Sequence, residues 1–154
     1  MKIKEALNKM SDLNDEVKRV LKEINYKDFG DLSGLKNDGG PEDTLIRDEL
    51  IDAAEHLDKF RRIINYLNRK VVKQGVLKLN ERGRYEIVED EDEYEYTCGN
   101  AIEFLYYDDY DEREKWRISR VEATKGKYYI VGYEKLKMDG LKVRVREKPG
   151  IFEF

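Results

Sequence analysis

The sequence predicts an α+β protein in which an antiparallel helical hairpin is followed by a small antiparallel SH3-like β-barrel or rolled sheet. Two observations predict this order. Apolar residues recur every three or four positions up to about residue 71, which is the period of a helix. After Gly75 they fall into short runs separated by glycine-containing turns, as in β-hairpins. We therefore expect a helical domain at 1–74 and a β domain at 75–154.

The first helix is predicted to begin at Ile3 and to run for about six turns. Its apolar residues fall on one stripe, at Ile3, Leu7, Met10, Leu13, Val17, Val20, Leu21 and Ile24. Residues 25–40 then carry four glycines among Asp, Asn and Ser, which favour backbone turns over a helix. This segment is predicted to be a loop.

The second helix is predicted to begin at Pro41, because proline suits the first turn of a helix. Its apolar stripe is the most regular pattern in the chain: Ile46, Leu50, Ala53, Leu57, Phe60, Ile64, Leu67 and Val71. So regular a stripe requires a partner helix, which the first helix supplies in an antiparallel hairpin. Any part of the stripe left over could contact a second copy, so a homodimer is one hypothesis.

Short strands with tight turns are expected throughout the second half of the chain. Apolar residues before and after the turn NERGR predict a hairpin of 76–79 with 85–88. Further strands are predicted at 94–97, 101–106, 116–123, 128–133 and 141–146. Gly126 and Gly140 mark two of the turns between them.

Charge is distributed unevenly along the β half, although the net charge of the chain is only −4. Residues 86–114 contain 13 acidic side chains and one basic one, whereas residues 115–148 contain 11 basic and four acidic ones. Such charges usually form a solvated surface. The functional alternative is a protein-binding surface of acidic residues and tyrosines: Glu89, Asp90, Glu91, Asp92, Glu93, Tyr94, Tyr107, Asp108, Asp109, Tyr110 and Asp111.

Carboxylates spaced along loops can imitate phosphates and occupy a groove built for DNA or RNA. The first functional hypothesis is therefore a protein that binds a nucleic-acid-processing effector. The alternative is a nucleic-acid-binding accessory protein that uses the basic residues Arg120, Lys142, Arg144 and Arg146. The many carboxylates nearby in the sequence disfavour direct binding of nucleic acid, because they repel phosphates. A third hypothesis is a dimeric scaffold held together by its helices.

The residues that common reactions require are scarce. A single histidine, His56, and a single cysteine, Cys98, cannot provide the clustered ligands of a structural zinc site. We expect His56 on a helix surface and Cys98 as a buried thiol. Glycine-rich phosphate loops and calcium-loop spacing are absent from the sequence. The chain is therefore predicted not to be an enzyme and to need no cofactor or metal.

We expect neither a membrane span nor a secretion signal in this sequence. The chain begins MKIKEALNKM and never reaches the ~18 consecutive apolar residues that a membrane span requires. One cysteine cannot form an internal disulfide, which agrees with a reducing compartment. We therefore expect a soluble, cytoplasmic protein.

Several short motifs of the β half resemble those of one domain family. They are Gly75, Leu77, Asn80 and Gly83 to Glu86; Thr97 to Gly99 with Ile102 and Glu103; Trp116 with Arg120 to Glu122; Tyr128 with Tyr129; and Gly140, Leu141, Val143 and Arg144. Residues 75–146 thereby resemble an uncharacterised family of small β domains from Gram-positive bacteria, often carried on phages, plasmids and conjugative elements. The resemblance implies a mobile-element context, in which an inhibitor of a CRISPR effector or a restriction enzyme is the most specific hypothesis.

Overall fold

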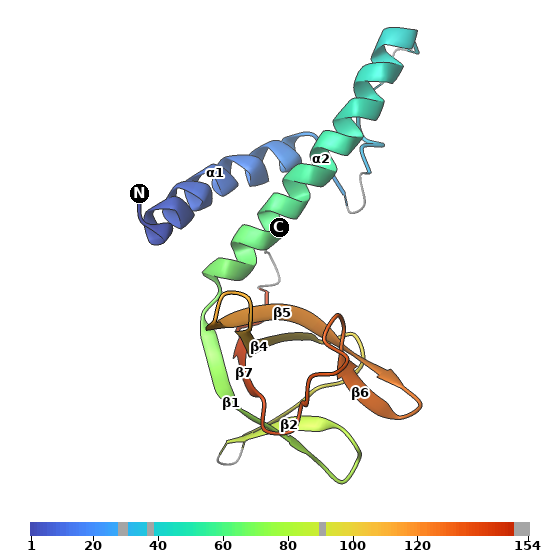
Figure 1. Ribbon diagram of the computed structural model, residues 1–154. Coiled ribbons are helices and arrows are strands. Elements are labelled where there is room, and N and C mark those ends of the chain that lie inside the picture. Colours follow the sequence, from blue (N-terminus) through green and yellow to red (C-terminus); the bar gives the residue numbers. More distant parts are fainter. Residues whose placement is uncertain (28–30, 37–38, 90–91, 150–154) are drawn as a thin grey trace. The chain divides into compact units, whose positions relative to one another are not determined.

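The computed structural model describes residues 1–27, 31–36, 39–89 and 92–149 of the chain. The described residues form two compact units, a helical unit at Met1–Arg69 and a β unit at Lys70–Lys148 (Figure 1). The division between them falls a few residues before Gly75.

The helical unit consists of α1 (Ile3–Glu23) and α2 (Pro41–Asn68). Both helices begin where the sequence predicted. The core between them is small and is formed by Val17, Leu21, Tyr26, Leu32 and Ala54. Over the described residues, neither helix has an apolar stretch long enough to cross a bilayer.

Two side-chain hydrogen bonds fix the register of the hairpin. Asn68 Nδ2 donates to Ser11 Oγ at 2.9 Å, and Asn14 Nδ2 donates to Asn65 Oδ1 at 2.9 Å. From Ser11 to Asn14 the chain advances three residues along α1, while the partner on α2 moves back three residues, from Asn68 to Asn65. The two helices therefore run in opposite directions. The prediction of an antiparallel hairpin is confirmed.

The prediction that the second helix continues through Val71 was wrong. α2 ends at Asn68, and Val71 begins β1, where it pairs with Arg146. Pairing with a neighbouring strand overrides the helical period at its last position. Gly75 does not end the helical half either, because it lies inside β1. A Cβ added at this position would stand 2.5 Å from Ile87 Cγ2. This glycine is required by the close approach of Ile87.

The β unit is one antiparallel sheet of seven strands in the order β3-β2-β1-β7-β4-β5-β6. Its turns follow the sequence prediction. At the β5–β6 turn, Lys125 (φ 53°) and Gly126 (φ +76°) adopt the left-handed conformation that a two-residue hairpin turn requires. The strands are β1 (Val71–Leu79), β2 (Tyr85–Glu89), β3 (Asp92–Glu95), β4 (Ala101–Asp108), β5 (Arg113–Thr124), β6 (Lys127–Ile130) and β7 (Lys142–Arg146).

The sheet curls, as the ribbon shows (Figure 1), and its described residues enclose a hydrophobic core. Ile87 of β2 and Ile130 of β6 belong to the same core cluster, although four strands separate β2 from β6 in the sheet. The described part of the β unit is therefore a half-barrel, which confirms the predicted α+β class and the barrel-like sheet. The core is formed by Leu77, Ile87, Tyr96, Ile102, Phe104, Val121, Ile130, Met138, Leu141 and Val143.

Candidate protein-binding surface

The two acidic, tyrosine-rich segments lie at opposite ends of the strands. Leu79 pairs with Tyr85 beside the β1–β2 turn, so the far end of β2, at Glu89, lies toward the start of β1. β1 and β4 both pair antiparallel with β7 and therefore run in the same direction. The β4–β5 turn consequently lies at the end of the sheet where β1 finishes. The structure does not bring the two segments together into one surface.

Asp108 organises the β4–β5 turn. Its Oδ1 accepts hydrogen bonds from the backbone N–H groups of Tyr110 (2.9 Å) and Asp111 (3.2 Å). Its Oδ2 lies 3.2 Å from both Lys115 Nζ and Arg117 Nη2. The hydrogen bond from Asp111, followed by that from Lys115, holds the pKa of the Asp108 carboxyl below its usual value. Asp108 is thus used to build the turn.

The ordered turn presents tyrosine to solvent. The side chain of Tyr110 is 95% exposed at the tip, and Tyr107, at the end of β4, is 54% exposed. Asp109 and Glu112 beside them are also exposed. We call these four residues the hairpin tip. Asp111 is set apart from them because it forms an ion pair with Lys115.

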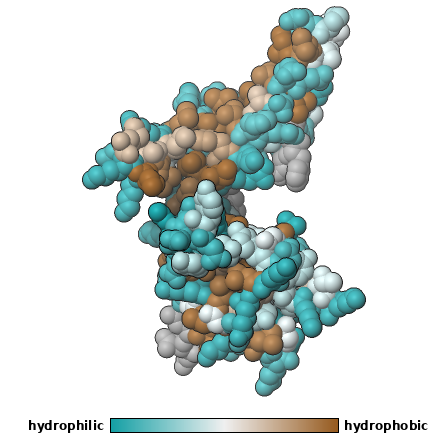
Figure 2. Space-filling view, in the orientation of Figure 1, coloured by the Kyte–Doolittle hydropathy of each residue, from teal (hydrophilic) through white to brown (hydrophobic). Residues whose placement is uncertain are grey.

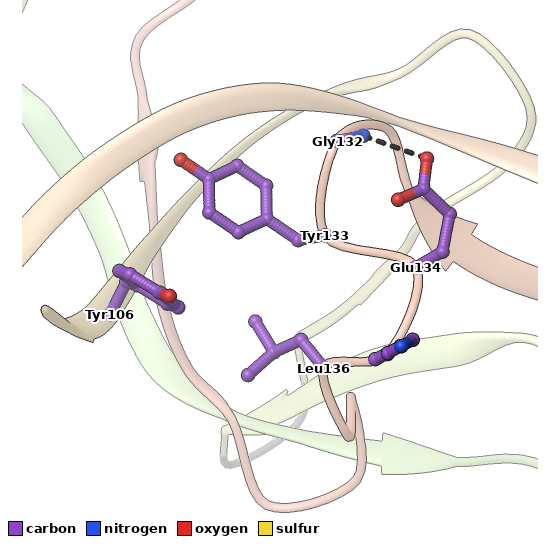
Figure 3. A pocket seen from close by; sticks show the side chains of 6 residues that line it. Tyr106, Gly132, Tyr133, Glu134 and Leu136 are labelled. Carbon is purple, nitrogen blue, oxygen red and sulfur yellow. Dashed lines mark hydrogen bonds between the residues drawn. The ribbon is translucent and has the colours of Figure 1, made fainter. Parts of the chain in front are cut away.

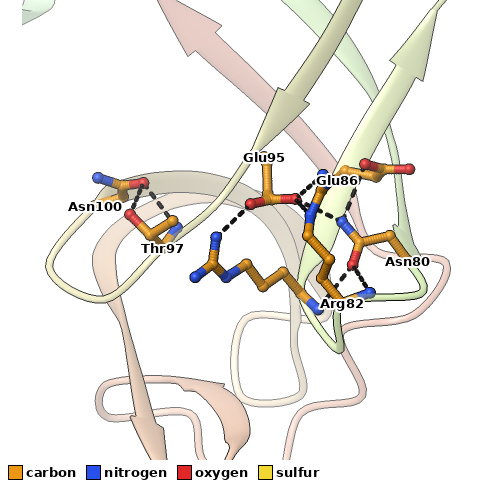
Figure 4. A network of polar contacts seen from close by, with 7 residues as sticks. Asn80, Arg82, Glu86, Glu95, Thr97 and Asn100 are labelled. Atoms are coloured by element: carbon orange, nitrogen blue, oxygen red, sulfur yellow. Dashed lines mark hydrogen bonds and ion pairs between the residues drawn. The ribbon is translucent and has the colours of Figure 1, made fainter.

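The β2–β3 segment is partly neutralised by neighbouring basic residues (Figure 4). Glu95 forms ion pairs with Arg82 and with Arg84, the latter at 2.8 Å, and it accepts a hydrogen bond from Asn80 Nδ2 at 2.7 Å. The bonds from Arg84, Arg82 and Asn80 lower the pKa of Glu95 to about 2. This carboxylate therefore stabilises the β1–β2 turn by binding three of its side chains.

The predicted site residues of that segment, which do not include Glu95, differ in accessibility. Glu93 is exposed, whereas Tyr94 is half-buried and packs edge-on against Tyr96 with ring centroids 4.9 Å apart. Tyr94 thus supports the core. Asp90 and Glu91 lie outside the described residues, as do the side chains of Glu89 and Asp92.

The predicted basic strand face contains an acidic residue at its centre. Glu103 of β4 is paired in register with Arg144 of β7 and is only 3% exposed. Arg144 Nε lies 2.6 Å from Glu103 Oε1, and Arg146 Nε lies 2.9 Å from Oε2. The Arg144 guanidinium also stacks on the Trp116 ring, 4.1 Å from its centroid. Two of the four predicted nucleic-acid contacts are therefore engaged inside the protein.

The other two predicted contacts lie elsewhere on this face. Lys142 is exposed at the start of β7. Arg120 is exposed as well, but its Nε lies 3.1 Å from Glu122 Oε1. The face therefore keeps less unpaired positive charge than the sequence suggested.

An aromatic depression lies on the half-barrel (Figure 3). Tyr106, Tyr133 and Leu136 line it, and the two rings meet edge to face at 5.1 Å. Its one carboxylate, Glu134, accepts a hydrogen bond from Gly132 N at 3.0 Å. The depression, of about 450 Å³, is suited to an apolar side chain.

The single histidine and cysteine are both on the surface. His56 lies exposed on α2 as expected, with Nδ1 2.8 Å from the backbone oxygen of Asp52. Cys98 is exposed, so the expectation of a buried thiol was wrong. It follows Thr97 in a turn that Asn100 closes, and such a turn leaves its side chain in solvent. Among the described residues, no group of three or more His, Cys, Asp or Glu side chains is placed to hold a metal ion.

Fold and surface together define a small antiparallel β domain with an ordered, tyrosine-bearing hairpin tip. In a comparison with protein families, residues 75–145 match the model described as Domain of unknown function (DUF5348). The match lies within the β unit and covers just under half of the chain. No curated protein matches the chain. No solved structure matches it either.

Proposed function

We propose that this chain is a non-enzymatic protein-interaction module whose hairpin tip binds another protein. The observation that carries the proposal is the exposure of Tyr110 on a turn already ordered by Asp108. Tyrosine is enriched among residues that dominate binding energy, because it brings large contact area with few rotatable bonds. A turn that is ordered before binding loses little conformational entropy on binding.

The charge of the tip favours a basic partner. Asp109 and Glu112 are exposed beside Tyr110, and Glu114 is exposed on the adjoining strand. These negative charges attract a positively charged surface toward the tip and accelerate association. Burial of the tyrosine then supplies affinity at the centre of the contact.

A narrower form of the proposal names the class of partner. Exposed carboxylates around a tyrosine can occupy a groove that normally holds a phosphate backbone. The partner would then be a cytoplasmic nucleic-acid-processing effector of the host, and the chain an anti-CRISPR or anti-restriction protein of a mobile element. The charge of the tip and the family resemblance support this form. Asp108, Asp111 and Glu95 do not, because basic side chains of the chain itself neutralise them.

Direct nucleic-acid binding is the competing function, and the burial of Glu103 between Arg144 and Arg146 disfavours it. A guanidinium that already binds a carboxylate must give up that bond before it can bind a phosphate.

Capture from extracts of the native host, followed by mass spectrometry, tests the proposal. Three baits are compared: the wild-type chain, Tyr110→Ala and the matched surface control Lys127→Ala. The proposal requires a partner that the wild type and the control capture and that Tyr110→Ala loses. Identical captures by all three baits would overturn it. Titration of labelled duplex DNA and RNA against the wild type at low salt distinguishes the competing function, since only a direct binder retains nucleic acid.

A further inference from the structure

Each helix of the hairpin extends past the end of the other. The register set by Ser11 with Asn68 and by Asn14 with Asn65 places the last residue of α1, Glu23, opposite His56. Residues 41–50 of α2 therefore extend past the end of α1, and residues 3–10 of α1 extend past the end of α2.

Both extensions expose large apolar side chains, each at least 44% accessible to solvent. Figure 2 shows apolar surface on both helices, including the first turns of α2. On α1 the exposed residues are Ile3 and Met10, and on α2 they are Leu45, Ile46 and Leu50. Isolated exposed apolar residues are ordinary, but a contiguous set on one element marks an interaction site.

The apolar stripe of α2 is not centred on α1. The buried side chains of α2 are Ala54, Asp58, Ile64 and Asn65. Within the stripe Ile64 is buried and Leu57 and Phe60 pack on the hairpin core, whereas Ile46, Leu50 and Ala53 remain exposed. At 100° per residue, Ala54 and Asn65 lie roughly 90° around the helix from the centre of the stripe. The stripe is therefore left open mainly before Leu57, in the part of α2 that extends past the end of α1.

The two extensions carry opposite charge. Residues 1–10 contain three lysines and one glutamate, whereas residues 41–50 contain four carboxylates and one arginine. The acidic residues suit the positive end of α2, but lysines at the start of α1 oppose the dipole of their own helix. The lysines therefore gain nothing from the dipole of α1, and a negative surface outside the helix would stabilise them.

We propose that the helical unit pairs with a second copy of itself around a two-fold axis. The first turns of α1 in each copy pack on the first turns of α2 in the other, so apolar meets apolar and basic meets acidic at both ends. If the two hairpins lie antiparallel, both of these contacts form together, because a two-fold axis relates one to the other as in an isologous interface. The product is a four-helix assembly. This inference is independent of the proposed function, whose surface lies in the β unit.

Complementary charge reversal tests the pairing in the full-length chain. Variant one carries Lys4→Glu and Lys9→Glu, and variant two carries Asp48→Lys and Glu49→Lys. The mass and dissociation constant of each chain are measured by sedimentation, and circular dichroism monitors folding. The control, Lys125→Glu with Lys127→Glu, makes the same charge change as variant one at the β5–β6 turn.

The wild type and the control are expected to be dimers. Each variant alone brings like charges together at both ends and should dimerise about tenfold or more weakly. An equimolar mixture of the two variants restores opposite charges at both ends. It should form a mixed dimer with an affinity within roughly threefold of the wild type. A wild type that stays monomeric at every concentration, or variants that dimerise as well as the control, would overturn the inference.

Discussion

Arg144 Nε lies 2.6 Å from Glu103 Oε1 in the middle of the sheet, on neighbouring strands of the β unit. Glu103 is almost fully buried and Arg146 binds its second oxygen, so one carboxylate binds two guanidiniums. The strand face that the sequence predicted to be basic therefore contains an ion cluster, in which the Arg144 guanidinium also stacks on Trp116.

Removal of Glu103 should destabilise the fold strongly. Glu103→Ala leaves Arg144 and Arg146 without the carboxylate that they share, and breaking a buried pair in this way costs about 3–5 kcal/mol of unfolding free energy. The exposed Glu114→Ala should change stability by less than about 0.5 kcal/mol. Urea denaturation of the two variants checks this, and equal midpoints would contradict a structural role for Glu103.

Gly75→Ala should also be destabilising, because the new Cβ would stand 2.5 Å from Ile87 Cγ2. Overpacking of this kind costs about 1–3 kcal/mol. Ile87→Ala removes the opposing methyl group, so the double variant should be more stable than the sum of the two single changes predicts. A double-mutant cycle from denaturation curves measures this coupling, and strict additivity would argue against the contact.

The stability of the β unit should include an acid-sensitive contribution from Glu95. Its pKa is 4.5 as a free carboxyl and about 2 in the folded chain, where Arg84 and Arg82 bind it. A lowered folded-state pKa stabilises the fold fully above the unfolded value, and that contribution disappears as the pH falls from 4.5 toward 2. Melting temperatures of the wild type and Glu95→Gln should differ near neutral pH and converge in acid. A difference that does not change with pH would contradict this assignment.

Asp108 should control the order of the hairpin tip. Asp108→Ala removes the acceptor for the amides of Tyr110 and Asp111, and their hydrogen exchange should accelerate by about tenfold or more. Asp108→Asn keeps the acceptor oxygen and serves as the matched variant with smaller effects. Exchange measured by NMR distinguishes the two, and unchanged rates in Asp108→Ala would show that the turn is ordered by other contacts.

Local features of the fold were predictable from the sequence because they depend on nearby residues. Pro41 marks the start of α2, and Gly126 marks a turn whose backbone requires a positive φ. The end of α2 was not predictable in this way. Val71 continues the helical stripe, and only its pairing with Arg146 makes it part of a strand.

The site was less predictable, because ion pairs depend on which strands become neighbours. Glu103 and Arg144 are far apart in the sequence, and β4 and β7 are not consecutive strands. The sequence indicated Tyr107, Asp109 and Tyr110 of the tip but not Glu112. It could not indicate that Asp108 and Glu95 are bound by basic side chains of the same chain.

The affinity of the captured, purified partner for the wild-type chain and for Tyr110→Ala tests the central claim most directly. The account predicts that the substitution costs about 2 kcal/mol of binding free energy, or about thirtyfold in Kd, in isothermal titration calorimetry. Lys127→Ala should bind as the wild type does. Equal affinities of the wild type and Tyr110→Ala would contradict the claim that the hairpin tip is the binding surface.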